Sequence, residues 1–340
     1  MSSPMRTKGS ALKAGTPPRA APYAAAGANA VAVALTGAVL AVQASEPVVA
    51  VVPAERAGDE TLPCGSFLPG EHRTLEGGVK SWVQTQTGVE LGFLEQLCTL
   101  GAPSRTEIDV PHLVSVSYLA LVGPQQCSDR TRATWRGWYS FFPWEDWRNG
   151  RPDCLNEIEQ RLEAWAAKPE PSYPARWKPD RRQRVRITFG GAGTTWDEEK
   201  VAERYELLSE AGIVGATAEG ATGITQRLPR LMHPMLGDQS LVLARAVGEL
   251  RRAIKCRPIV FELMHDEFTL FELQKAVEAI LGPHLHKQNF RRLVEGCGLV
   301  EPTGELRLRT GGRPAQLYRF RRDVVYEHAS PGVRLKPGRM

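Results

Sequence analysis

From residue 31 onward, the chain alternates between continuous apolar runs and stretches in which apolar residues recur at helical spacing. The runs Val31 to Gln43 and Pro47 to Val52 are separated by the short turn Ser45-Glu46. Two β-rich runs joined in this way predict a hairpin of two strands. The preceding residues 1–28 are rich in alanine, proline and serine, and this composition predicts a disordered tail.

The next segments predict a helix followed by two strands. The apolar residues of Arg73 to Gln86 lie on one helical face, and Gly88 follows as a stop signal. Gly92 to Leu100 and His112 to Val122 have the length and composition of strands. The second of these is apolar enough to lie centrally in a sheet.

The middle of the chain predicts three helices and one short strand. Asp153 is placed to cap the first helix, and Val185 to Phe189 predicts a strand after a basic, proline-rich link. Thr195 and Glu198 have the spacing of a capping box that opens the second helix. Asp238 to Lys255 has heptad-like apolar spacing and predicts a helix long enough to join two domains or two subunits.

The C-terminal quarter has the order helix, tight turn, helix and β-hairpin. The capping box Thr269-x-x-Glu272 opens a helix that ends at Gly282, and a second helix begins near His286 and stops at Gly296. Short strands are predicted over residues 298–301, 305–309 and 316–320, with a glycine-rich tip at residues 310–313. This order is the winged helix-turn-helix pattern, whose second helix enters the major groove of DNA.

Charge is distributed unevenly along the 340 residues. The chain has 43 Lys and Arg against 38 Asp and Glu, a net charge of +5. From Arg251 to Met340 the counts are 17 and 10, a net +7, so the part upstream sums to −2. A basic quarter on a near-neutral body is typical of a nucleic-acid-binding appendage, and a solvated basic face is the alternative.

The predicted recognition helix and wing supply the residues expected to contact DNA. With Phe290, Leu293 and Val294 turned inward, the polar side chains of that helix face outward. Long donors there can reach base edges, and arginines of the wing can reach phosphates. The candidate DNA-binding residues are Lys287, Gln288, Asn289, Arg291 and Arg292 on the helix, and Arg307, Arg309 and Arg313 on the wing.

Cysteine usage and hydropathy bear on the compartment. The six cysteines are scattered singly without zinc spacing, which favours reduced thiols in a cytoplasm. No apolar run reaches the roughly 18 residues that would span a bilayer. One alternative stays open: basic residues precede the apolar stretch Ala30 to Val42, and Val42-Gln43-Ala44 resembles the cleavage site of an export signal.

Several stretches of the chain resemble a known family. Nudix-related transcriptional regulators of NAD metabolism, of the NrtR type and closer still of the NadQ type, have a C-terminal domain similar to FELMHDEFTLFELQKAVEAILGPHLHKQNFRRLVEGCGLVEPTG and the later GGRPAQLYRF. The Nudix-like half of the same proteins resembles LPCGSFLPGEHRTLEGGVKSWVQTQTGVELGFLEQLCTLG and HLVSVSYLALVG. The likeness covers roughly residues 30 to 330.

This resemblance implies an α/β (α+β) Nudix-like N-terminal domain followed by a C-terminal winged helix-turn-helix domain. We expect a tail over residues 1–28, an effector-sensing domain over 29–236, a linking helix with the winged helix over 237–330, and a tail over 331–340. The resemblance further implies a cytoplasmic homodimeric repressor of NAD biosynthesis genes that binds an inverted-repeat operator in double-stranded DNA. We expect NAD, ADP-ribose or ATP as its effector, no required cofactor and no membrane association.

The chain departs from the wider Nudix pattern where catalysis requires carboxylates. A working Nudix helix ends R-E-apolar-x-E-E-x-G-apolar, because those glutamates hold Mg²⁺. Counted back from Gly88, the corresponding residues here are Ser81, Trp82, Val83, Gln84, Thr85, Gln86 and Thr87. No catalytic or metal-binding residue is therefore expected. The alternative is a nucleotide-diphosphate (ADP-ribose) hydrolase with an accessory nucleic-acid-binding domain.

Three residues are candidates for effector binding. Arg105 resembles an arginine position of the family and, like Arg73, could pair with a phosphate; for both, a solvated surface residue is the alternative. Trp135 to Trp147 holds four of the eight tryptophans, and Trp138 could stack on an adenine unless the segment forms core or a dimer interface. The turn Gly190 to Gly193 has the composition of a weak anion-binding nest.

Overall fold

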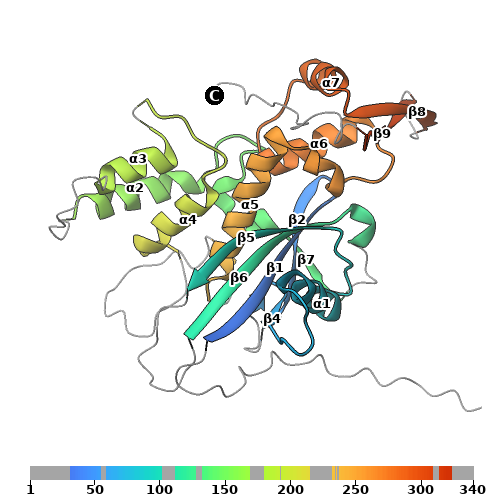
Figure 1. The fold of residues 1–340 in the computed structure, drawn as a ribbon. Coiled ribbons are helices and arrows are strands. Elements are labelled where there is room, and N and C mark those ends of the chain that lie inside the picture. The colour runs from blue at the N-terminus through green and yellow to red at the C-terminus, as the bar shows by residue number, and fades with distance from the viewer. Residues whose placement is uncertain are drawn as a thin grey trace, which may run out of the picture.

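The computed structural model describes residues 31–54, 59–101, 112–127, 132–168, 180–191, 193–214, 232–233, 235, 237–308 and 314–323. The described elements form a mixed sheet with one helix on one face and several on the other (Figure 1). A smaller module of two helices and a β-hairpin, residues 258–320, lies at one end of the sheet and is called the C-terminal module below.

The sheet mixes parallel and antiparallel pairs. Its strands are β1 (Val31–Gln43), β2 (Glu46–Pro53), β3 (Glu60–Thr61), β4 (Cys64–Ser66), β5 (Phe93–Gly101), β6 (His112–Leu121) and β7 (Thr134–Gly137). The order is β3-β2-β1-β6-β5, while β4 pairs with β1 and β7 pairs with β2. β1 and β6 are parallel, and the other pairs are antiparallel. β6 is therefore an interior strand, as its apolar composition predicted.

The predicted hairpin is confirmed. Ala44 and Ser45 join β1 to β2, and both have positive φ values, 50° and 66°. Two consecutive positive φ values are typical of the tight hairpin turn whose twist matches that of its strands. β1 pairs with β2 on one side and β6 on the other, so the apolar stretch considered as an export signal is a central strand. None of the described helices is both long and apolar enough to cross a membrane.

Helix α1 (Leu75–Thr87) covers one face of the sheet and confirms the predicted helix (Figure 1). Val79 and Val83 are buried against the strands. Gly37 of β1 permits this approach, because a Cβ there would lie 2.9 Å from Cγ2 of Val83. Gly88 ends the helix in the left-handed conformation, with φ 77°.

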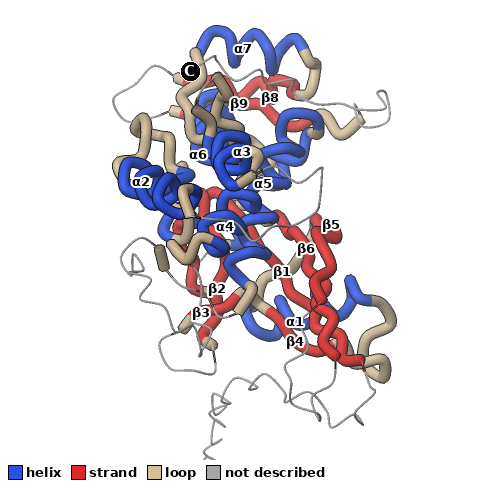
Figure 2. Tube along the Cα trace, turned by 90° about the vertical axis from the view of Figure 1, so that its left-hand side faces the viewer, coloured by secondary structure: helices blue, strands red, loops and turns tan. Residues whose placement is uncertain are grey.

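Helix α5 (Gln239–Cys256) covers the opposite face and is enclosed by its neighbours (Figure 2). The predicted heptad residues are all fully buried, namely Leu243, Val247, Leu250 and Ile254. Within α5, which is described throughout, Arg252 and Cys256 are the exposed residues. The long helix therefore joins parts of one chain and offers little surface to a second subunit.

The helix α3 (Arg181–Phe189) corrects one prediction, because residues 185–189 are helical rather than a strand. The side chain of Asp180 accepts a hydrogen bond from the Gln183 N–H at 2.7 Å, and the Gln183 side chain accepts one from the Asp180 N–H at 3.2 Å. This capping box and the packing of α3 on its neighbours outweigh the strand preference of the β-branched residues.

Two further helices are present as predicted, but they start differently. α2 (Cys154–Ala166) follows Asp153, whose side chain makes no capping hydrogen bond. α4 (Val201–Glu210) has Lys200 as its N-cap, so the capping box predicted at Thr195 and Glu198 does not open it. The Glu198 carboxylate instead forms an ion pair with Lys255 of α5.

The C-terminal module has the predicted helix-turn-helix and hairpin. It contains α6 (Leu270–Leu281), α7 (Lys287–Gly296), β8 (Val300–Arg307) and β9 (Ala315–Phe320). The capping box Thr269-x-x-Glu272 makes both of its reciprocal hydrogen bonds. Two predicted strands are in fact one, β8, whose pairing with β9 shifts between Pro302 and Leu306. Gly304, with φ 86°, allows this irregularity. The predicted tip at residues 310–313 lies outside the described residues.

One hydrophobic core extends from the sheet through α5 into the module. It includes Leu40 and Leu121 of the sheet, Val247 of α5, and Val277 and Phe290 of the module. The module is thus packed on the rest of the chain, and α5 contributes to both parts.

Candidate nucleic-acid interface and effector site

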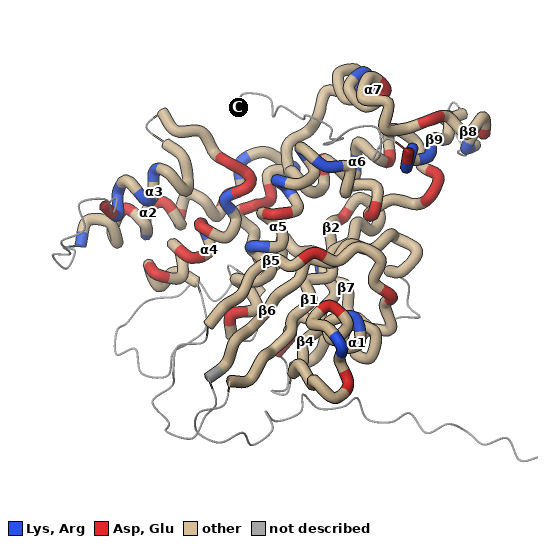
Figure 3. Tube along the Cα trace, viewed as in Figure 1, with Lys and Arg blue, Asp and Glu red and all other residues tan. Residues whose placement is uncertain are grey.

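The outer face of α7 presents the predicted DNA-binding residues together. Phe290 and Val294 are buried in the shared core. On the other side of the helix the exposed residues include all five candidates, Lys287, Gln288, Asn289, Arg291 and Arg292. Figure 3 shows the cations of α7 on the side of the module away from the sheet. Long polar side chains at the start of a projecting helix have the geometry needed to read a DNA groove.

The cations of α7 have weak partners within the chain. Nε of Arg291 lies 2.9 Å from Oε1 of Glu295, which raises the pKa of the guanidinium. The Arg291 side chain is nevertheless 60% exposed. Arg292 reaches Oδ1 of Asn289 only at 3.5 Å. Exposed pairs of this kind contribute little stability, so both arginines can exchange these partners for DNA.

In the wing, Arg307 has a partner within the chain. That guanidinium donates to Oε1 of Glu272 at 2.6 Å and to the carbonyl of Glu267 at 3.3 Å. Arg307 therefore holds β8 against the start of α6. Leu306 and Leu308, its neighbours, are exposed, at 56% and 79%. The other predicted wing residues, Arg309 and Arg313, lie outside the described residues.

The helix α1, where the Nudix pattern has its carboxylates, is bonded to the neighbouring strand β4. Nε1 of Trp82 donates to the Ser66 carbonyl at 2.9 Å. The side chain of Gln86 pairs with the backbone of Cys64, accepting from its N–H at 3.0 Å and donating to its carbonyl at 2.8 Å. Trp82 also packs directly on Gly65, where a Cβ would lie 2.3 Å from the indole. Two of the three positions expected to carry carboxylates therefore pin α1 to β4.

The three candidate effector residues do not lie together in the structure as described. Arg73 is exposed next to the start of α1. Arg105 lies outside the described residues. The prediction that Trp138 stacks on an adenine is wrong. Trp138 is 1% exposed and packs in the main core, so its ring has no open face for an adenine. This burial favours the core interpretation of the aromatic segment. Among the described residues, no cluster of three His, Cys, Asp or Glu could hold a metal ion.

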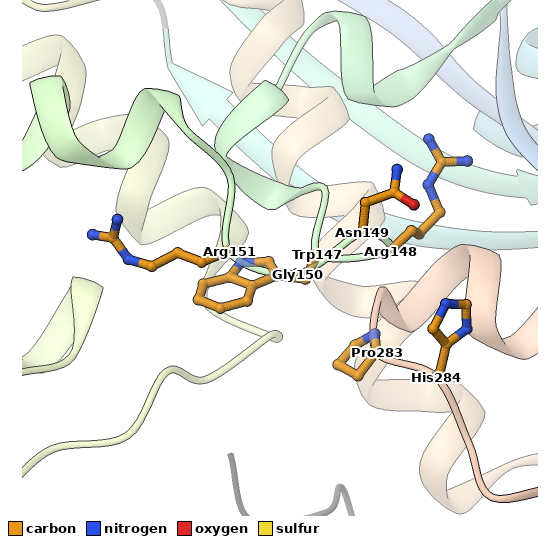
Figure 4. Close-up of a pocket in the computed structure, with 7 residues that line it drawn as sticks. All are labelled: Trp147, Arg148, Asn149, Gly150, Arg151, Pro283 and His284. Carbon is orange, nitrogen blue, oxygen red and sulfur yellow. The ribbon is translucent and has the colours of Figure 1, made fainter.

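Two other features have few free groups for an anion. In the glycine turn, the N–H groups of Gly191 and Thr194 donate to each other's carbonyls, so they are not available to a ligand. A cavity of about 600 Å³ lies between the loop after η3 (Pro143–Glu145) and the turn after α6 (Figure 4). The guanidinium groups of Arg148 and Arg151 point away from it and pair with carboxylates of this chain.

A buried ion cluster links η3, α4 and α5 to the end of α6 in the C-terminal module. The Glu145 carboxylate accepts from Arg204 at 2.5 and 2.9 Å and from Arg251 at 2.8 Å, and all three side chains are buried. Arg251 also donates to the carbonyl of Ile280 at 2.9 Å. Because the last carbonyls of α6 carry partial negative charge, they help to balance the second cation.

This cluster was missed from the sequence, although a signal for it exists. Arg251 follows Val247 by four residues, and Arg204 follows Val201 by three. Both arginines therefore lie on the apolar faces of their helices. A cation in an apolar stripe indicates a buried partner, because charged side chains are rarely buried unpaired. The identity of that partner, Glu145, depends on the fold.

Comparison with known proteins agrees with this architecture. Residues 260–320 match the NrtR DNA-binding winged helix domain. A protein of Acinetobacter baylyi described as an ADPR responsive transcriptional repressor, NtrR, is 41% identical over 83 residues, which are 24% of this chain. The match spans only 33% of that relative's length.

Solved structures extend the likeness to most of the chain. NrtR of Shewanella oneidensis in complex with a 27mer DNA has a TM-score of 0.51 at 19% identity, covering 86% of this chain and 95% of that one. A second crystal structure of the same protein has a TM-score of 0.50 at 20% identity, with coverages of 86% and 94%. At such identity the likeness establishes a common fold.

The chain therefore has a Nudix-like domain followed by a winged helix, which confirms the predicted fold class. NrtR has this architecture, and the predicted resemblance to Nudix-related transcriptional regulators of the NrtR type is confirmed.

Proposed function

We propose that this protein is a DNA-binding transcriptional regulator that represses NAD biosynthesis genes in the cytoplasm. One observation carries the proposal: a winged helix domain of the NrtR type presents Lys287, Gln288, Asn289, Arg291 and Arg292 as exposed polar side chains on α7. In this proposal the base edges are read by Lys287, Gln288 and Arg291. The remaining candidates contact the sugar-phosphate backbone of the DNA. Residues 29–236 act as the sensing domain, and α5 connects it to the DNA-binding module.

Selection from a random duplex library tests DNA binding directly. The full chain is incubated with the library, and retained duplexes are sequenced. We expect an inverted repeat with half-sites about one helical turn apart, because a homodimer presents two recognition helices. Light scattering measures the oligomeric state in parallel. Retention of no preferred sequence would contradict the proposal.

We further propose that the sensing domain binds an NAD-related adenine nucleotide. ADP-ribose is the first candidate, because the Acinetobacter baylyi relative is described as ADPR responsive; NAD and ATP follow. Arg73 and Arg105 are the proposed phosphate contacts. A ligand at about 100 times its Kd stabilises the folded state by about 2.7 kcal/mol, so a thermal-shift panel identifies it. The effector must also change the affinity for the selected duplex, since regulation requires coupled sites.

We propose that the Nudix-like domain has no hydrolase activity. The support is that Trp82 and Gln86 stand where two metal-binding carboxylates would be required. The test is Mg²⁺-dependent hydrolysis of ADP-ribose, NADH and diadenosine polyphosphates. Turnover that co-elutes with the pure protein would favour the alternative, an ADP-ribose hydrolase with an accessory nucleic-acid-binding domain.

A further inference from the structure

The turn between α6 and α7 is held by side chains of α6. The N–H of Leu285 donates to Oε1 of Glu278 at 2.9 Å. The carbonyl of Leu285 accepts from Nε2 of Gln274 at 2.8 Å, and the same amide nitrogen donates to Oε1 of Glu278 at 2.8 Å. Both backbone polar groups of this one turn residue are therefore bonded to two side chains one helical turn apart.

The Glu278 carboxylate is buried and fully bonded. The residue is only 4% exposed. Its second oxygen, Oε2, lies 2.8 Å from Nζ of Lys275 and 3.4 Å from Nδ1 of His284. Burial alone would raise the pKa of this carboxyl, but the hydrogen bonds from Lys275, the Leu285 N–H, Gln274 and His284 together lower it. The carboxylate therefore stays ionised at neutral pH and remains an acceptor.

The turn between α6 and α7 is connected to the rest of the protein through α6. Arg251 of α5 donates to the carbonyl of Ile280, and the hydroxyl of Tyr139 donates to that of Ala279 at 2.8 Å. The C-terminal end of α6 is thus hydrogen-bonded to α5 and to η2 (Trp138–Ser140). Glu278 lies in the same last turn of α6, so its hydrogen bond from the Leu285 N–H fixes the chain two residues before α7 begins.

Helix α7 has few other restraints at its start. Its N-cap, His286, makes no capping hydrogen bond with its side chain. The buried side chains of α7 are Phe290, which closes the first turn, and Val294. Before the helix, Leu285 packs partly buried against the core. The direction of the first turn, which carries Lys287 and Gln288, therefore depends on how Leu285 is held.

We propose that Glu278, supported by Gln274, is a positioning residue for the recognition helix. It does not touch DNA. It orients the first turn of α7 so that Lys287 and Gln288 meet base edges together. This inference rests on the proposed DNA-binding function, because it specifies how the same interface gains its sequence discrimination.

The test compares Glu278→Ala with Glu278→Gln in the full chain, using the duplex selected by the wild type and a scrambled duplex. We expect Glu278→Ala to reduce the ratio of the two affinities by about tenfold or more, the effect of losing aligned base contacts. Affinity for the scrambled duplex and for ADP-ribose should stay within about twofold, because phosphate attraction and the sensing domain are unaltered. Glu278→Gln should recover most of the ratio, since its amide oxygen can still accept from the Leu285 N–H.

A matched control and a second variant keep the outcome decisive. Glu249→Ala removes a half-buried carboxylate of α5, whose partner is the exposed Arg252, and should leave the ratio unchanged. If Glu278→Ala does not fold cooperatively, Gln274→Leu removes the donor to the Leu285 carbonyl and should lower the same ratio. Unchanged discrimination in a folded Glu278→Ala, equal losses on both duplexes, or no recovery by Glu278→Gln would overturn the inference.

Amide hydrogen exchange separates this inference from the proposed function. Without any DNA, Glu278→Ala should speed exchange at Leu285 and in the first turn of α7 by about tenfold or more, because local opening becomes easier. Glu278→Gln should exchange close to the wild type. If the wild type selects no DNA but this exchange pattern holds, the function fails while the positioning contact stands. If exchange at Leu285 is unchanged, the contact itself is wrong.

Discussion

At the scale of single residues, the availability of an arginine to DNA depends on the partner it already has. Arg291 has an exposed partner, Glu295, on its own helix. Arg307 instead joins β8 to Glu272, which also caps α6. Releasing Arg291 costs little, whereas releasing Arg307 loosens the wing. The two arginines are therefore not equivalent, although the sequence placed both in one basic module.

Arg291→Ala should reduce discrimination between the selected and scrambled duplexes. The loss of a bidentate base contact costs about 1–3 kcal/mol. Arg252→Ala is a matched control, because Arg252 is 55% exposed and also pairs with a glutamate on its own helix, Glu249. Binding titrations at several salt concentrations measure both. Equal effects of the two variants would remove Arg291 from the interface.

Two cysteines should differ sharply in reactivity. Burial raises the pKa of the Cys127 thiol to about 12, whereas Cys256 is exposed at the end of α5. The thiolate is the reactive form, so at pH 8 only about one Cys127 thiol in ten thousand is ionised. We expect iodoacetamide to modify Cys256 first and Cys127 only after unfolding, as followed by peptide mass spectrometry. Equal rates in the folded protein would contradict the buried position of Cys127.

At the scale of elements, α1, which occupies the place of the catalytic helix in the Nudix pattern, serves as a structural support. Trp82 and Gln86 hold β4 through backbone groups of Ser66 and Cys64. β4 pairs with β1, so the same contacts also brace the central strand. A side chain that bonds backbone on a neighbouring strand is not free to coordinate a metal ion.

Gln86→Ala should destabilise the protein by about 1–3 kcal/mol, because two part-buried backbone groups of Cys64 lose their partner. Gln84→Ala on the exposed face of α1 is the control and should change the free energy of unfolding by less than about 0.5 kcal/mol. Denaturant unfolding measures both variants. A Gln86 variant as stable as the Gln84 variant would show that the paired hydrogen bonds contribute nothing.

At the scale of the whole molecule, the Nudix-like domain and the C-terminal module share one core and one buried ion cluster. Glu145 lies between Arg204 of α4 and Arg251 of α5, and Arg251 continues to the end of α6. The two halves therefore meet through polar contacts with defined geometry. Any effector that changes the DNA-binding module has to act across this junction or around it.

Glu145→Gln should destabilise the protein by about 3–5 kcal/mol, because it leaves two buried guanidinium groups without a carboxylate. Glu249→Gln, in an exposed pair, should cost less than about 1 kcal/mol. Denaturant unfolding followed by tryptophan fluorescence gives both values. A loss below about 1 kcal/mol for Glu145→Gln would mean that the backbone carbonyls alone satisfy the two arginines.

The sequence by itself determined the elements whose signals are local. The apolar runs of the first hairpin, the stop at Gly88 and the capping box at Thr269 each depend on residues close in the chain, and all are present in the structure. The exposed face of α7 followed from helical spacing in the same way. The missing Nudix carboxylates could also be read directly.

Tertiary structure decided what depends on residues far apart in the chain. Trp138 lies in an aromatic segment whose composition suggested stacking on an adenine, but packing of that segment against other helices buried it. Residues 185–189 had strand preference, but their cap and neighbours made them helical. Glu145 and Arg251 are separated by 106 positions, and no local pattern could pair them. Buried polar groups need specific partners, and only the folded chain brings those partners together.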